Sequence, residues 1–392
     1  MSLLKSRFIE LIGNIQNPKY QLVELNEICE FIKDGTHQTP IYTEDRVNGF
    51  KFLSSKDVTS QKINWSNIKY IPKELHEQLY AKLSPKRGDI LLAKNGTTGV
   101  AAVVDSDEIF DIYVSLALLR PKSGVNVSYL CSALNSEDLK RQFNSSLKGI
   151  GVPNLHLREI KKARIIFPPI DIQNKISSIT KQIDKSKFLL QQILEKFELL
   201  KKSRFIEMFI EKRYPTASLD ELSICGGEYG AQSSAIEYHP NRPRYVRITD
   251  INEDGSLNND YASSANIKDD EQYRLKYGDF LFARMGATVG KTYAYTFGDQ
   301  IYAGYLIRYR LNLEKILPEY LFAFTRLNCY WKWVSINQNG AAQPGINAKK
   351  YGSLYVPVPP IEEQKKFIEL SQQIDKSKLI IQKALEDLVG KV

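Results

Sequence analysis

The clearest regularity in this 392-residue chain is an alternation of apolar and polar positions between Pro168 and Arg213. The apolar positions advance by four and then three residues, a spacing typical of a helix that packs along one seam against another helix. Pro169 suits a first helical turn, and Pro215 suits the residue that ends the helix. The seam consists of Ile172, Ile176, Ile179, Ile183, Ser186, Leu190, Ile193, Phe197 and Leu200.

A second stretch, from Pro359 to Val392, repeats the first at a constant shift of 191 residues. PPIDIQ recurs as PPIEEQ and QIDKSK recurs unchanged, so that Gln173 of the first copy corresponds to Gln364. A long helix with one apolar seam needs a partner helix, and this second stretch supplies one. The repeated seam consists of Phe367, Leu370, Ile374, Ser377, Ile381, Ala384 and Leu388.

The start of the chain matches the end of the first long helix. Lys5–Glu10 repeats Lys202–Glu207 at a shift of 197 residues. We expect residues 1–13 to form a helix that completes the second long helix and brings the two chain ends close together. The alternative is a frayed leader with no defined partner.

The two segments between the long helices indicate one mixed domain written twice. Short runs rich in β-branched and aromatic residues, separated by Gly, Pro, Asn and Asp, are typical of strands. In the first segment they predict strands at Phe50–Leu53, Ile90–Ala93, Val100–Val104, Ile112–Leu119 and Ala163–Phe167, with short helices at Tyr129–Asn135 and Glu137–Leu147. The fold class is therefore α/β in the α+β sense. Its parts are a helix at 1–13, a domain at 14–167, a central helix at 168–213, a second domain at 214–358 and a final helix at 359–392.

One block is shared strongly by the two domains. GDILLAKNG, from Gly88, matches GDFLFARMG, from Gly278, at a shift of 190 residues, and a glycine-rich loop follows each. Elsewhere the two segments diverge. This combination predicts a common framework that presents two different surfaces, as expected for two readers of different targets.

The composition indicates which class of partner the chain binds and in which compartment it is found. The net charge of +9 favours an anionic partner, nucleic acid first. The four cysteines form no CxxC pair, and there is no signal peptide or membrane-length apolar run, so we expect a cytoplasmic protein without a disulfide framework.

Catalytic motifs are weak. Met285–Thr292, MGATVGKT, falls short of a phosphate-binding loop because Met285 stands where the first glycine belongs. The segment FPPI lacks the polar first residue of an amino-methyltransferase motif, and the four histidines lack metal-ligand spacing. We therefore expect neither a catalytic site nor a metal site.

The basic loops are better candidates for contacts with DNA. Lys and Arg bind phosphates or guanine edges, and Asn reads adenine. The groups at 94–98 and 284–291 recur in both copies, and Arg244–Tyr245–Val246–Arg247 is expected to present alternate basic side chains from a strand. The candidate DNA-binding residues are Lys94, Asn95, Thr97, Thr98, Arg244, Arg247, Arg284, Lys291 and Tyr302.

The PPIDIQ and PPIEEQ starts, the two GD blocks and the twofold order of domain and long helix together resemble the specificity subunit of type I restriction–modification systems. The resemblance covers essentially the whole chain. It departs mildly at Asp171 and Ile172, where the family usually has acidic residues before the glutamine.

This resemblance implies two target-recognition domains, each reading one half of a bipartite site on double-stranded DNA. It implies antiparallel pairing of the two long helices in a quasi-twofold, circular arrangement. It also implies docking of two methyltransferase subunits and association with restriction (translocase) subunits. S-adenosylmethionine, ATP and Mg²⁺ would belong to those partners, and this subunit would be non-catalytic.

Two other classes remain open. One is a coiled-coil scaffold without a DNA role, which predicts neutral domains between the long helices and no dependence on salt. The other is an enzyme fusion with its own methyltransferase or nuclease activity, which the missing cofactor loop and the chain length disfavour.

Overall fold

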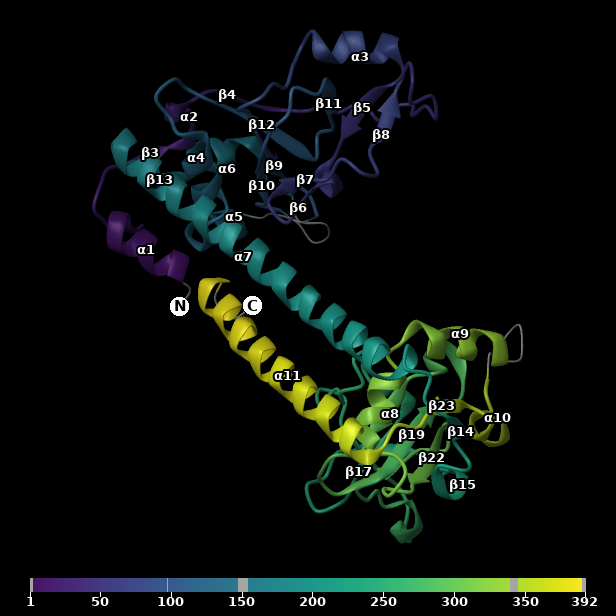
Figure 1. Ribbon diagram of the computed structural model, residues 1–392. Helices are drawn as coiled ribbons and strands as arrows, with labels where there is room; N and C mark the ends of the chain where they lie inside the picture. The colour runs from purple at the N-terminus through teal and green to yellow at the C-terminus, as the bar shows by residue number, and fades with distance from the viewer. Residues whose placement is uncertain (1–2, 97, 147–153, 339–344, 390–392) are drawn as a thin grey trace. The chain divides into compact units, whose positions relative to one another are not determined.

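Two long helices dominate the structure, a computed structural model (Figure 1). Helix α7 spans Ile170–Phe205 and continues through a π-helical turn at Ile206–Ile210, while helix α11 spans Ile361–Val389. Each begins directly after a proline pair, because the first helical turn has no use for the N–H that proline lacks. The heptad pattern therefore predicts both helices correctly.

The structure describes residues 3–96, 98–146, 154–338 and 345–389. The chain divides into two compact units, residues 1–190 with 383–392, and residues 191–382. Each unit contains one of the two mixed segments together with neighbouring parts of the long helices. Within the described ranges, every helix is too short or too polar to cross a membrane.

The first unit is built on two sheets. An antiparallel sheet has the order β10 (Ala101–Val103), β9 (Ile90–Ala93), β12 (Leu116–Pro121) and β4 (Cys29–Asp34). A second sheet has the order β11 (Phe110–Ile112), β5 (Phe50–Leu53) and β8 (Lys69–Ile71), with β11 and β5 parallel. The smaller strands are β1 (Gly13–Asn14), β2 (Asn17–Pro18), β3 (Leu22–Glu24), β6 (Val58–Thr59), β7 (Lys62–Ile63) and β13 (Arg164–Ile166).

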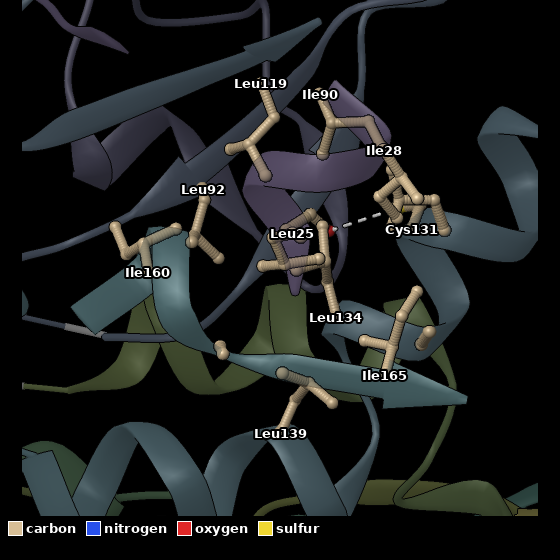
Figure 2. Close-up of a cluster of buried hydrophobic side chains, with 14 of the residues drawn as sticks. Leu25, Ile28, Ile90, Leu92, Leu119, Cys131, Leu134, Leu139, Ile160 and Ile165 are labelled. Atoms are coloured by element: carbon tan, nitrogen blue, oxygen red, sulfur yellow. Dashed lines mark hydrogen bonds between the residues drawn. The ribbon is translucent and has the colours of Figure 1, made fainter. Parts of the chain in front are cut away.

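Strand β9 is buried on both faces, which explains its continuous apolar sequence. Successive side chains of a strand point to opposite faces. Ile90 and Leu92 enter one core, together with residues of the helices α2, α4, α5 and α6 (Figure 2), while Leu91 and Ala93 enter another core. The helices of this unit are α1 (Leu3–Ile12), α2 (Leu25–Ile28), α3 (Lys73–Tyr80), α4 (Val127–Leu134), α5 (Glu137–Ser146) and α6 (Leu157–Lys162).

One predicted strand is wrong. The run Ile112–Leu119 is not continuous, because β11 ends at Ile112 and β12 begins at Leu116. Between them the chain passes from one sheet to the other, and Tyr113 forms an isolated bridge with Thr36 on the way. A run with a single polar residue, Ser115, cannot reveal this crossing, since the residues on both sides of it are buried.

The second unit repeats this plan. Its antiparallel sheet has the order β15 (Ser223–Tyr229), β22 (Leu306–Leu311), β19 (Asp279–Ala283) and β20 (Thr292–Ala294), and β17 (Arg244–Val246) pairs in parallel with β21 (Gln300–Tyr302). The other strands are β14 (Thr216–Ser218), β16 (Ala235–Glu237), β18 (Ser263–Ala265) and β23 (Tyr355–Pro357). The shorter helices are α8 (Pro318–Phe324), α9 (Asn328–Asn337) and α10 (Ala348–Gly352).

The repeated GD block is a charged turn that enters the central strand. Gly88 and Gly278 have φ values of +90° and +95°, a region that side chains disfavour. The following aspartate, Asp89 or Asp279, receives a two-pronged pair of hydrogen bonds from Arg120 or Arg310 on the neighbouring strand. The aspartate raises the pKa of each arginine, because it stabilises the charged form.

Residues Leu3–Ile12 form helix α1 within the predicted range 1–13, and its completion of the second long helix stays a prediction. Phe8 and Ile12 of this helix belong to the same core of the first unit as Ile176 of α7. In the second unit the equivalent Phe205 packs against Phe367, with ring centroids 5.2 Å apart. Helix α1 therefore packs against the core of the first domain, as the end of α7 packs against the core of the second domain.

A buried glutamine joins each long helix to its domain. The side-chain oxygen of Gln173 accepts from the N–H of Asn126 at 2.9 Å, and its amide donates to the carbonyl of Pro168 at 2.8 Å. Gln364 makes the corresponding bonds to Leu317 and Pro359, both at 2.9 Å. The oxygen and the nitrogen of each glutamine side chain thus both have a partner.

Within the second unit, α7 and α11 run antiparallel. Lys201 pairs with Asp375 at 2.9 Å, and Lys378 pairs with Glu198. As the residue number rises from 198 to 201 on α7, the number of its partner on α11 falls from 378 to 375, so the two helices run in opposite directions.

Burial varies among the predicted seam positions, and it shifts to a neighbouring residue in the second half of α7. Ile176 and Phe367 are buried and Ile374 is 5% exposed, whereas Ile193 is 39% exposed and its neighbour Leu194 is half-buried. The prediction is therefore wrong at Ile193, because a 3.6-residue helical turn gains on a strict 3.5-residue repeat. Leu200, at 41%, and Ser186 are exposed as well. The predicted seam positions that are half-buried are Ile172, Ile179, Ile183, Leu190, Phe197, Leu370, Ser377, Ile381, Ala384 and Leu388.

Candidate nucleic-acid interface

The glycine-rich loop of each domain leaves the central strand through the same backbone frame. In the first unit the N–H of Lys94 donates to the carbonyl of Ser115 at 2.8 Å, and the carbonyl of Lys94 accepts from the N–H of Leu155 at 3.0 Å. In the second unit Arg284 makes the equivalent bonds at 3.0 Å and 2.9 Å. The two loops thus begin from matching positions, as the repeated GD blocks predict.

A second segment reaches each loop from the outer strand of the sheet. Strand β4 ends at Asp34 and is followed by Gly35, while β15 ends at Tyr229 and is followed by Gly230. A Cβ atom would lie 2.1 Å from a backbone carbonyl oxygen at Gly35 and 2.4 Å from one at Gly230. Only glycine allows so close an approach. We call the meeting of these two segments the loop junction of each unit.

Sequence reasoning missed the residues that follow these two glycines. His37 and Gln38 are exposed in the first unit, and Gln232 and Ser234 are exposed in the second. The available signal was a glycine directly after a strand in both repeats, within DGTHQ and YGAQS. These side chains add hydrogen-bonding groups beside the predicted loops.

Lys94 is not available to a partner. Its side chain is 5% exposed and forms an ion pair with Asp34 across the sheet. A buried cation is stable only when an anion compensates it. The burial of Lys94 therefore argues against the predicted contact with DNA, and we assign it to the support of the loop junction.

Arg284 occupies the equivalent position but has a different partner. Its guanidinium lies over the ring of Tyr229, 4.8 Å from the ring centroid, where Lys94 has the carboxylate of Asp34. The contact retains the full positive charge of the arginine, because an aromatic ring attracts a cation without neutralising it. The second loop junction thus presents a charge that the first does not.

The other loop candidates in the first unit lie beside the junction. Asn95 and Thr98 are half-buried, and Asn95 forms an isolated backbone bridge with Asn154. The predicted contact at Thr97 lies outside the described residues. Direct contact with DNA by Asn95 and Thr98 stays a prediction.

The two strand arginines do not share one strand face. Strand β17 ends at Val246, and Arg247 caps a short helical turn instead. Arg244 donates to the side-chain oxygen of Asn259 at 2.6 Å, and Arg247 pairs with the buried Asp250 at 2.9 Å. The expected alternation is wrong, and both arginines are already engaged within the domain.

Lys291 and Tyr302 complete the predicted set. Lys291 pairs with Glu253 at 2.8 Å. Tyr302 is 1% exposed, and burial raises the pKa of its hydroxyl. The burial of Tyr302 argues against a contact with DNA, while Lys291 would have to leave Glu253 in order to make one.

The loop junctions offer hydrogen-bond donors, acceptors and one stacked guanidinium, which are groups suited to binding. Across the described ranges, no three His, Cys, Asp or Glu side chains gather closely enough to hold a metal ion.

Comparison with known proteins gives a consistent result. A family model described as the type I restriction modification DNA specificity domain matches residues 17–199 and 233–389. The chain is 22% identical over 388 residues to a putative type I restriction enzyme MjaX specificity subunit of Methanocaldococcus jannaschii, covering 93% of this chain and 88% of that protein. It is 21% identical over 380 residues to the type I restriction enzyme EcoKI specificity subunit of Escherichia coli, covering 87% and 78%.

Solved structures share the fold. A chain from a structure titled for complex assembly and conformational transition of the type I R-M system aligns with a TM-score of 0.65 at 17% identity, covering 95% of both chains. The type I restriction-modification S subunit from M. genitalium aligns with a TM-score of 0.50 at 12% identity, covering 95% of this chain and 94% of that one.

Proposed function

Because this chain belongs to the type I restriction-modification DNA specificity family, we propose that it is the subunit that selects the DNA sequence in such a complex. Each of its two domains would read one half of a bipartite site on double-stranded DNA. The subunit would be non-catalytic. S-adenosylmethionine, ATP and Mg²⁺ would serve the partner subunits.

One observation carries this proposal. The two loop junctions have the same backbone frame and different side chains, with Lys94 and Asp34 in one and Arg284 and Tyr229 in the other. Phosphate contacts position a protein on DNA, whereas base-edge contacts distinguish sequences. Two junctions with the same backbone hydrogen bonds but different side chains suit two half-sites of different sequence.

The long helices would set the distance between the half-sites. A stiff connection turns domain separation into half-site spacing, as in other two-headed readers. The ion pairs of Lys201 and Lys378 with α11 and α7 residues, respectively, support a paired and therefore rigid connection in the second unit.

The same helices would dock two methyltransferase subunits, with restriction subunits joining for cleavage. Phe188 and Leu189 on α7 are 58% and 46% exposed, and Leu379 and Ile380 on α11 are 67% and 70% exposed. The two pairs are equivalent under the 191-residue repeat. Exposed apolar side chains at two equivalent positions suit two copies of one partner.

The test is to express this chain with a cognate methyltransferase subunit and to sequence the methylated genomic sites. We expect one bipartite motif that disappears when this chain is omitted. Methylation that is unchanged without the chain would reject the proposal.

Purified protein separates the two alternatives. A coiled-coil scaffold would show no DNA binding in the presence of the methyltransferase subunit and no dependence on salt. An enzyme fusion would modify or cleave DNA on its own. A specificity subunit should differ from both. It should bind DNA with an affinity that falls strongly as salt rises, and it should leave the DNA unmodified without its partners.

A further inference from the structure

The guanidinium of Arg284 lacks a hydrogen-bond acceptor within the described part of the chain, although neighbouring residues hold it in place. It is half-buried, and its Nε atom is buried with no acceptor among the described residues. Glu228, the acidic residue beside Tyr229, is already paired with Arg308. A buried donor without an acceptor is costly, so it needs an explanation such as an ordered water or a ligand. The Nε atoms of Arg244 and Arg326 also lack an acceptor among the described residues, but these two guanidiniums donate through other nitrogens, to Asn259 and Thr292.

The surroundings of Arg284 hold it in place. Tyr229 lies under the guanidinium, and its hydroxyl accepts from the N–H of Ala348 at 3.2 Å, which fixes the ring. The backbone N–H of Arg284 donates to the carbonyl of Tyr305, whose side chain is 57% exposed. Arg284 therefore follows the end of β19 in a position held by a backbone hydrogen bond to Tyr305, an exposed aromatic residue.

The first domain provides the internal comparison. Lys94 stands at the same position of the repeat, but Asp34 neutralises it and the protein buries it. At the second junction the cation is half-buried and has an aromatic ring where the first junction has an anion. The tyrosine at the second junction keeps the charge uncancelled and stacks on the planar face of the guanidinium.

We propose that Arg284, supported by Tyr229, donates hydrogen bonds to an acceptor on the DNA of the half-site that the second domain reads. The planar fork of arginine matches the O6 and N7 atoms of guanine, or two oxygens of a phosphate. Lys94 makes no equivalent contact, so the two domains read their half-sites with different chemistry at this position. This inference rests on the proposed function.

The experiment compares Arg284→Ala, Arg284→Lys and Tyr229→Leu in the complex with the methyltransferase subunit. Arg242→Ala is the matched control, because Arg242 is an exposed arginine of the same domain that precedes β17 and is not part of the loop junction. The measurements are the methylated motif in cells and the binding of a duplex carrying that motif over a range of salt concentrations. Circular dichroism and thermal melting confirm that each variant folds.

A guanine contact predicts that Arg284→Ala relaxes one base pair in one half-site, with a loss of roughly 5- to 150-fold in discrimination. Arg284→Lys would not restore that base pair, since lysine lacks the fork, and Tyr229→Leu would weaken the same base pair. A phosphate contact predicts an unchanged motif, weaker binding to every sequence, a salt slope smaller by about one, and rescue by lysine. Either result supports the proposal and identifies the acceptor.

A folded Arg284→Ala complex that matches Arg242→Ala in motif, affinity and salt slope would overturn the proposal. That outcome differs from a failure of the proposed function, in which the unaltered chain itself would direct no methylated motif.

Discussion

Lys94 and Asp34 form the most deeply placed ion pair of the first loop junction, with side chains 5% and 15% exposed. Lys94→Met leaves Asp34 without its lysine partner in a poorly hydrated position, where the exposed imidazole of His37, 3.6 Å away, remains beside the carboxylate. We expect a loss of about 3 kcal/mol in the free energy of unfolding, measured by urea denaturation. The double variant Lys94→Met with Asp34→Asn should recover part of this loss, because it removes both charges.

The exposed Lys56→Met provides the control for that prediction, and its stability should stay within about 0.5 kcal/mol of the unaltered chain. If Lys94→Met is equally harmless, the ion pair does not support the loop junction.

Gln173 supports the entry of α7 through two bonds rather than through apolar packing. Gln173→Met keeps the volume but leaves the N–H of Asn126 and the carbonyl of Pro168 without their partner. We expect a loss of roughly 1–3 kcal/mol, because each buried polar group left unpaired costs its desolvation. Gln182→Met, at an exposed position of the same helix, should change little in the same unfolding experiment. Equal stability of the two variants would contradict the role of Gln173.

Among the elements, helix α11 has one face that packs and one that does not. Ile374 is 5% exposed and Ile380 is 70% exposed on the same helix. Ile374→Asp places a charge in the seam and should cost about 4 kcal/mol in unfolding free energy. Ile380→Asp should cost less than about 0.5 kcal/mol. Similar losses for both would contradict the placement of the seam.

The unpacked face of each long helix supports a separate prediction. Replacing Leu379 and Ile380 by serine should leave the chain folded, because both side chains are exposed, and should reduce the complex from two bound methyltransferase subunits to one. Light scattering after size-exclusion chromatography measures the mass of the complex. Serine at Phe188 and Leu189 should have the same effect at the equivalent position, and serine at the exposed Gln192 should have none. Two subunits still bound to either double variant would remove these residues from the docking surface.

At the scale of elements, the spacing of apolar residues predicted those helices, strands and turns whose conformation depends mainly on nearby residues in the sequence. The long helices, the strands at Phe50–Leu53 and Ile90–Ala93 and the repeated GD turn follow from apolar spacing and from glycine. The pairing of side chains does not, because Asp34 lies 60 residues from Lys94 and meets it only through the sheet. The same limit explains Tyr302, whose aromatic ring suited DNA in the sequence but fills a core in the fold.

The described residues form two sets of buried cores, one in each unit, and these sets share no residue. One group comprises the cores around Ile90 and Leu91, and the other those around Phe280, Leu281 and Ile301. A domain with its own core can be exchanged without repacking the other. The repeat in the sequence predicted this independence, while the different chemistry of the two loop junctions emerged only from the structure.

Exchanging residues 14–167 for the corresponding segment of a relative should therefore alter one half of the methylated motif and leave the other half unchanged. The spacing between the halves should also persist, because residues 168–213 and 359–392, which form the long helices, stay in place. Sequencing of methylated genomic sites measures both features at once. Arg284 remains native in this chimera, so the half-site that survives the exchange should be the one that Arg284→Ala weakens. A motif altered in both halves would show that the two domains do not read DNA independently.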